Sequence, residues 1–169
     1  MKSVKKILLS ITYILLTVCM YGQSPKYAYH TATATVRVPI SIAKDQDLDF
    51  GYLASGTTSG TAVISTSGVV TRTGGVTILG GGTPTNARFT VTGEAGRTFT
   101  ISRPSTITLT RSGGGTLTLT ITSDTTSPAT IGADYTKVIN IGGSISVSAN
   151  KATGVYTNAT GLYLTVNYN

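Results

Sequence analysis

The chain has 169 residues, of which only 11% are charged, and it contains one cysteine, one histidine and no tryptophan. The length fits one domain with a core of useful size. The composition excludes an internal disulfide, leaves only His30 for a histidine-dependent triad, and lacks the ligand clusters of a metalloenzyme. We therefore expect a protein that is not an enzyme and that has no cofactor.

The N-terminus has the pattern of an export signal. Three lysines within the first six residues precede an apolar run over residues 7–18, which is shorter than the roughly 20 residues of a membrane span. We place cleavage after Gly22, so that residues 1–22 are a signal peptide and residues 23–169 form one domain. The expected location is the periplasm, the cell surface or the extracellular medium, with no transmembrane segment after cleavage.

Cys19 has two interpretations. In the first, it is removed with the signal peptide, which leaves a mature chain without thiols and dependent on packing for its stability. In the second, it is the lipid-bearing cysteine of a lipoprotein signal, although Val18 is larger than the residue that usually precedes such a cysteine.

The distribution of charged residues does not predict a nucleic-acid partner. Loss of the three signal lysines lowers the formal net charge from +7 to +4. The remaining lysines and arginines are scattered, without a basic run and without interleaved aromatic residues. A nucleic-acid interface concentrates positive charge on one patch, so we expect none here.

Residues 31–42 show the longest alternation of polar and apolar residues in the chain. Twelve residues are long for one strand, and Pro39 cannot donate a ladder hydrogen bond. The pattern predicts two strands in line or one strand that changes sheets. It also makes this segment the candidate strand for assembly with another copy. The apolar positions are Ala32, Ala34, Val36, Val38, Ile40 and Ile42.

Shorter alternating segments separated by glycine clusters follow. Gly74-Gly75 is interpreted as the turn of a tight hairpin. The expected strands are residues 61–65, 69–73 and 76–79, then two strands in which Ala87, Phe89 and Val91, and after a turn Phe99 and Ile101, point inward.

The second half of the chain repeats this pattern. Threonines alternate with Ile107 and Leu109, and after Gly113-Gly114-Gly115 with Leu117, Leu119 and Ile121, which is the strongest hairpin signal in the chain. Two strands, 138–141 and 145–149, are expected to flank Gly142-Gly143, and the last strand is expected over residues 162–168. About nine or ten short strands with one apolar face each predict an all-β fold, an immunoglobulin-like antiparallel β-sandwich.

Asp45, Asp47 and Asp49 form the acidic cluster of the sequence and are a weak calcium candidate. Phe50 stands where a calcium loop requires glycine, and no later glutamate follows nearby. The preferred interpretation is a solvated face with an apolar anchor, so we expect no metal.

Two further features of the sequence point to carbohydrate, either attached or bound. Asp124-Thr125-Thr126 has the Asp-Thr form that some bacterial O-glycosylation systems modify. Exposed tyrosines are candidates for stacking on sugars, although Tyr156 is better explained as a packing tyrosine. The tyrosine candidates are Tyr27, Tyr29, Tyr52, Tyr156 and Tyr163.

Several segments, taken in order, resemble a known family. They are residues 34–42 (ATVRVPISI), 47–51 (DLDFG), 89–93 (FTVTG), 142–145 (GGSI), 154–156 (GVY) and 164–169 (LTVNYN). From about residue 30 to its end, the chain resembles the bacterial domain of unknown function 4402. That family is similar to the spore coat protein U domain of chaperone–usher pilus subunits. The resemblance implies an immunoglobulin-like sandwich with a surface or fibre role and no catalytic site.

The leading functional expectation is an exported, non-enzymatic structural protein of the surface. It would be a fimbria-like or coat subunit that assembles with itself or with other surface subunits by strand addition. The alternative is a monomeric adhesion module that binds glycans or host surfaces.

Overall fold

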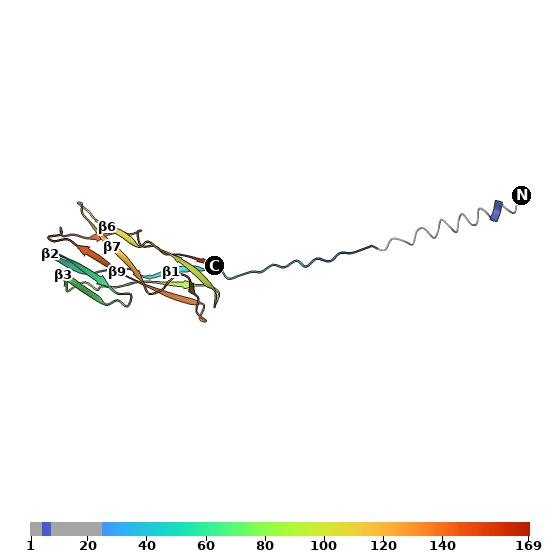
Figure 1. The fold of residues 1–169 in the computed structure, drawn as a ribbon, viewed down its shortest axis with the longest axis horizontal. Helices are drawn as coiled ribbons and strands as arrows, with labels where there is room; N and C mark the ends of the chain where they lie inside the picture. The colour runs from blue at the N-terminus through green and yellow to red at the C-terminus, as the bar shows by residue number, and fades with distance from the viewer. Residues whose placement is uncertain (1–4, 8–24) are drawn as a thin grey trace. The chain divides into compact units, whose positions relative to one another are not determined.

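The computed structural model describes residues 5–7, which are helical, and residues 25–169 (Figure 1). All strands of the described chain lie in one compact unit, which runs from Arg37 to Asn169. The predicted cleavage site and Cys19 lie outside the described residues. In the part of the chain that the structure describes, no helix has the length and apolar character needed to cross a membrane.

Eleven strands are present within residues 25–169 and form two antiparallel sheets. The predicted fold class, an immunoglobulin-like antiparallel β-sandwich, is confirmed. The strands are β1 (Ser41–Gln46), β2 (Tyr52–Ile64), β3 (Val70–Leu79), β4 (Ala87–Thr92), β5 (Thr98–Ser102), β6 (Thr106–Arg111), β7 (Thr116–Ser123), β8 (Ala129–Thr130), β9 (Thr136–Val147), β10 (Tyr156–Thr157) and β11 (Thr165–Tyr168).

The large sheet is organised around β9. Residues 136–141 of β9 pair with β4, and residues 143–147 pair with β2. Residues 141–145 pair with β7, which therefore occupies the opposite edge of β9. The sheet continues from β4 to β1, from β2 to β3, and from β7 to β6 and β10. Figure 1 shows β9 between the β6–β7 pair and the β2–β3 pair.

The small sheet has the order β11-β5-β8 and closes the sandwich. Its Phe99 is fully buried and belongs to the same apolar cluster as Val91 and Ile139 of the large sheet. Burial of these side chains is the main favourable contribution to folding. The inward positions predicted at Ala87, Phe89 and Val91 are all buried, and Ile101 packs against the core from β5.

The predicted glycine hairpin at 113–115 is confirmed. Its three glycines have φ values of 89°, 92° and 96°, which L side chains rarely adopt. The turn places Thr108 opposite Thr118 and Leu109 opposite Leu117, so that the threonines share the outer face of β6 and β7.

Two other predictions at glycine pairs were wrong: Gly74-Gly75 is not a hairpin turn, and Gly142-Gly143 does not separate two strands, because both pairs lie inside continuous strands. Gly74-Gly75 lies within β3, opposite an irregularity of β2 between Ser55 and Gly60. A Cβ on Gly75 would collide with the carbonyl oxygen of Thr58. Glycine is needed here because two backbones approach closely at a bulge.

Gly142-Gly143 lies at the point where β9 changes partner from β4 to β2. A Cβ on Gly142 would collide with the backbone of Ile64 and Ser65, and one on Gly143 would lie 2.6 Å from Cδ1 of Leu119. These glycines therefore allow the strand to pass between close neighbours.

The strand predicted over residues 31–42 begins only at Ser41, which corrects the expectation of a longer strand. Ser41 pairs with Thr92, the last residue of β4, so the preceding residues have no partner on that strand. Residues 25–40 belong to no strand. The last strand is likewise shorter than predicted, because β11 starts at Thr165.

Candidate functional sites

The three aspartates of the calcium candidate each have a different partner. Asp45 Oδ2 accepts a hydrogen bond from the hydroxyl of Thr90 (2.7 Å), Asp47 pairs with Lys44 Nζ (2.8 Å), and Asp49 Oδ1 accepts from the backbone of Gly51 (2.8 Å). Among the described residues, no three His, Cys, Asp or Glu side chains are grouped so that they could hold a metal ion.

The register of β1 contributes to this separation. A bulge between Lys44 and Gln46 interrupts the alternation at Asp45, where Arg88 Nε also approaches to 3.4 Å. Asp49 lies beyond the strand, in an isolated bridge to Thr85.

The candidate tyrosines come from separate segments. Tyr27 and Tyr29 precede the sandwich and are strongly exposed, while Tyr52 opens β2 and Tyr163 precedes β11. The hydroxyl of Tyr156 donates to the carbonyl of Ala152 (2.8 Å), and the Lys151 ammonium lies 5.7 Å from its ring centre. Tyr156 thus has the contacts of a packing tyrosine.

The candidate assembly strand is exposed over most of its length and packs against the core only at its C-terminal end. Val36 is 95% exposed and Val38 is 52% exposed. Ile40 and Ile42 pack against the core at the start of β1. Ala32 and Ala34 are exposed as well. The apolar residues of this segment up to Val38 are therefore exposed and belong to no strand among the described residues.

The point where this segment meets the sandwich is fixed by a polar cluster. Arg37 Nη1 lies 3.2 Å from Glu94 Oε2, and the backbone N–H of Glu94 donates to the hydroxyl of Tyr168 (2.7 Å). The Arg97 guanidinium lies 5.6 Å from the ring centre of Tyr168. The first residue of the compact unit and its last strand consequently meet at the loop after β4.

Strand β3 forms the longest open edge of the large sheet. It has ten residues and pairs only with β2 among the strands described. Arg72 is its only charged residue, and Arg72 Nη1 donates to the carbonyl of Val76 (3.1 Å). Leu79 at its end and Val69, the residue just before it, are exposed. Long edges with few charges are templates for pairing with another chain.

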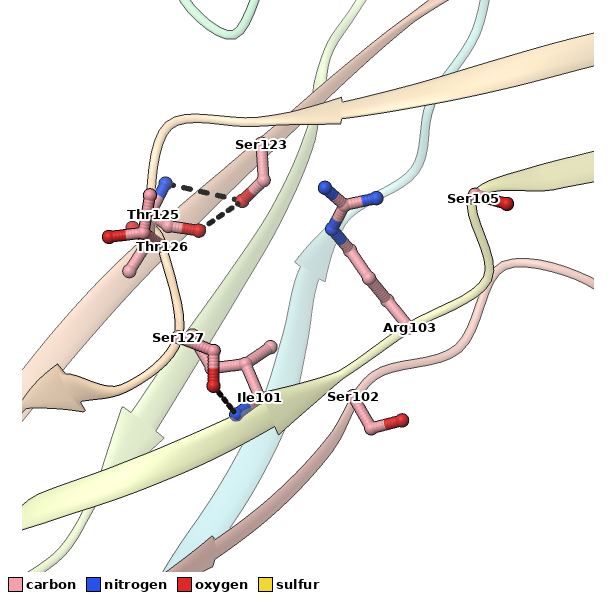
Figure 2. A pocket seen from close by; sticks show the side chains of 8 residues that line it. All are labelled: Ile101, Ser102, Arg103, Ser105, Ser123, Thr125, Thr126 and Ser127. Carbon is pink, nitrogen blue, oxygen red and sulfur yellow. Dashed lines mark hydrogen bonds between the residues drawn. The ribbon is translucent and has the colours of Figure 1, made fainter.

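An open pocket of about 510 Å³ lies between the end of β5 and the loop that follows β7 (Figure 2). Figure 2 shows the Arg103 side chain extending between that loop and Ser105, whereas Ser102 points away. The lining residues are Ile101, Ser102, Arg103, Ser105, Ser123, Thr125, Thr126 and Ser127.

Arg103 is not among the functional residues predicted from the sequence. The local signal is weak, since it consists of an isolated arginine in the sequence Ser-Arg-Pro-Ser between two strands. The pocket arises only when residues 101–105 meet residues 123–127 in the fold. Thr125 and Thr126 of the Asp-Thr motif lie in this wall, and the hydroxyl of Thr125 donates to Asp124 Oδ1 (2.7 Å).

Asp124 fastens this loop to β9. Its carboxylate accepts hydrogen bonds from the side chain (2.7 Å) and the backbone (3.0 Å) of Asn140, and its own N–H donates to the Asn140 carbonyl (3.1 Å). Partial burial acts to raise the pKa of Asp124, but the hydrogen bonds from Asn140 and Thr125 outweigh it, so the pKa lies below its ordinary value. These hydrogen bonds between Asp124 and Asn140, the Asp124–Asn140 clamp, are therefore strongest when the carboxylate of Asp124 is ionised.

Comparison with known proteins gives one match. The family model described as "Domain of unknown function (DUF4402)" matches residues 40–168, which contain all the strands of the described residues. No curated protein and no solved structure matches the chain. The similarity to the spore coat protein U domain stays a prediction. Because the family model covers most of its length, the chain belongs to the DUF4402 family.

Proposed function

We propose that the protein is an exported structural subunit of a surface assembly, in which residues 31–40 of one copy add a strand to the open edge of β3 in another. The observation that carries this proposal is the unpartnered apolar alternation ahead of β1. Val36 in this segment is 95% exposed.

The donor segment has what strand addition requires. Its apolar side chains recur at every second residue, so one face of an extended strand would be apolar and the other would carry three threonines, an arginine and a proline. Residues 31–40 have no strand partner in their own described chain. Pairing with an edge would satisfy backbone groups and remove the apolar face from water at the same time.

The edge of β3 matches the donor in length and chemistry. Both segments have ten residues, and in each of them the only charged residue is one arginine. The other edge strands are shorter, with six residues in β1, four in β11 and two each in β8 and β10. A longer edge offers more ladder hydrogen bonds to an incoming strand. Addition there requires Arg72 to release the Val76 carbonyl.

A pair of aspartate substitutions tests the donor. In the chain from residue 23 to 169, Val36→Asp places a charge on the face that would be buried, whereas Thr35→Asp places the same charge on the outer face. We expect Val36→Asp to abolish oligomers in light scattering and Thr35→Asp to retain them. Equal oligomerisation of both variants would contradict the role of the apolar face.

Cysteine pairing tests the acceptor separately. The segment from residue 23 to 169 contains no natural cysteine, so Thr35→Cys can be combined with Thr77→Cys on β3. We expect covalent dimers and higher species on oxidation of this double variant. The matched control combines Thr35→Cys with Thr118→Cys on β7, an interior strand, and should not crosslink above the level of the single variants. Equal crosslinking of both would overturn the choice of β3.

A further inference from the structure

Arg103 is a cation without a carboxylate partner among the described residues. The ion pairs found there involve Arg37, Lys44, Arg88 and Arg97. The hydrogen bonds of Arg103 within the described chain are made by Nη1, to the carbonyls of Pro104 (3.3 Å) and Ile121 (3.4 Å). The guanidinium is thereby held in place while Nε and Nη2, the edge that binds carboxylates in a bidentate manner, are left for a ligand.

The wall around this guanidinium is rich in hydroxyl groups. Six of its eight lining residues are serine or threonine, and all of these except Ser102, which points away, contribute to the wall. The hydroxyls of Ser123 and Ser127 serve the fold, since they accept hydrogen bonds from the backbone of Thr125 (3.2 Å) and Ile101 (3.0 Å). Ser105 and Thr126 are exposed and present further hydroxyls at the rim.

The pocket is preformed. Ser127 ties the loop to β5, and the Asp124–Asn140 clamp ties the same loop to β9. A binding site that is already ordered loses less conformational entropy when its ligand arrives. The volume of about 510 Å³ exceeds what a single inorganic anion would fill.

We propose that this pocket binds an acidic saccharide through a sugar carboxylate, as in a uronic acid unit. The carboxylate would lie against the Nε and Nη2 edge of Arg103, and the sugar hydroxyls would exchange hydrogen bonds with the serine and threonine hydroxyls. This site is independent of strand addition, because none of its residues belongs to residues 31–40 or to β3.

Titration followed by NMR tests the ligand class in the Val36→Asp variant of the chain from residue 23 to 169, which we expect to stay monomeric. The probes are galacturonic acid trimer, the neutral galactose trimer and inorganic sulfate. We expect the acidic trimer to shift amide signals of residues 101–105 and 123–127, with much weaker effects of the neutral sugar. Comparable shifts with sulfate would mean that the pocket binds an adventitious anion only. Shifts in other residues, or no shifts, would mean that the pocket binds no saccharide. Each of these results would overturn the proposal.

Substitution of the arginine gives the second test. Arg103→Gln removes a charged pair of hydrogen bonds and should weaken binding of the acidic trimer about tenfold or more. Arg103→Lys retains the positive charge but lacks the planar pair of N–H donors of a guanidinium, so it should recover only part of the affinity. The control is Arg88→Gln, which removes an arginine outside the pocket that pairs with Asp45. Equal affinity of Arg103→Gln and Arg88→Gln, both folded by circular dichroism, would contradict the assignment.

Discussion

Residues 31–40 and the β6–β7 hairpin have similar sequence patterns, but only the hairpin forms strands. Both alternate apolar residues with polar ones, mainly threonine. In the hairpin, Leu117 and Leu119 are buried and pair with β6. In the N-terminal segment, Val36 and Val38 are exposed and belong to no strand.

The difference lies in the availability of a partner. The glycines at 113–115 reverse the chain immediately and bring β7 beside β6. Ahead of β1, the possible partner β4 ends at Thr92, which already pairs with Ser41. Alternation therefore indicates that a segment can form a strand, whereas turns and partner lengths decide whether it does so within its own chain.

The largest expected contrast is between side-chain truncations in the core of the sandwich and in residues 31–40. Phe99→Ala empties a fully buried position and should lower the free energy of unfolding by about 3–5 kcal/mol. Val36→Ala removes a side chain that is 95% exposed and should change it by less than about 0.5 kcal/mol. Urea unfolding under monomeric conditions measures both values. A large loss for Val36→Ala would show that the segment packs on its own sandwich.

Glycine substitutions sharpen the comparison between strands and turns. Gly142→Ala forces a Cβ against the backbone of Ile64 and should cost about 2–4 kcal/mol. Gly114→Ala has open space around it but a φ of 92°, so it should cost only about 1 kcal/mol. Thermal unfolding of the two variants gives the ranking. A reversed ranking would mean that close approach does not explain the glycine inside β9.

The Asp124 clamp predicts a dependence on pH. The pKa of Asp124 is lowered by folding, so its contribution is present above the ordinary aspartate value and is lost as the pH falls through the lowered pKa. Asp124→Ala should cost about 1 kcal/mol at neutral pH, given partial screening by solvent. The stability difference from the natural chain should shrink below pH 4. A constant difference down to pH 2 would argue against the ionised clamp.

The smallest effect is expected at the contact of Arg37 with the loop after β4. Glu94→Gln removes the partly exposed ion pairs with Arg37 and Arg97 and should cost about 0.5 kcal/mol or less. The backbone N–H of Glu94 still reaches the Tyr168 hydroxyl in this variant. Thermal unfolding at low and high salt measures the effect. A loss above about 2 kcal/mol would show that these pairs hold the sandwich together.

The sequence predicts the strands better than it predicts their connections. Period-two alternation correctly identified the buried face of β4 and both strands of the β6–β7 hairpin. It could not separate glycines that turn the chain, as at 113–115, from those that permit close approach, as at 142–143, because both appear as local glycine clusters. That distinction depends on neighbours far away in the sequence.

The candidate sites were less predictable. The alternation drew attention to the donor segment, but only the pairing of Ser41 with Thr92 shows why it is left without a partner. The pocket at Arg103 depends on contact between two segments about twenty residues apart. Spacing within either segment carries no information on that contact. Conversely, the acidic cluster was evident in the sequence, yet its carboxylates are bound to separate partners.

Light scattering after size-exclusion chromatography tests strand addition most directly. The chain from residue 23 to 169 is compared with the compact unit from residue 37 to 169. We predict that the longer form assembles into oligomers or fibres, while the shorter form stays monomeric with nearly unchanged thermal stability. A monomeric longer form, together with an unfolded shorter form, would contradict the account, because residues 23–36 would then complete their own sandwich.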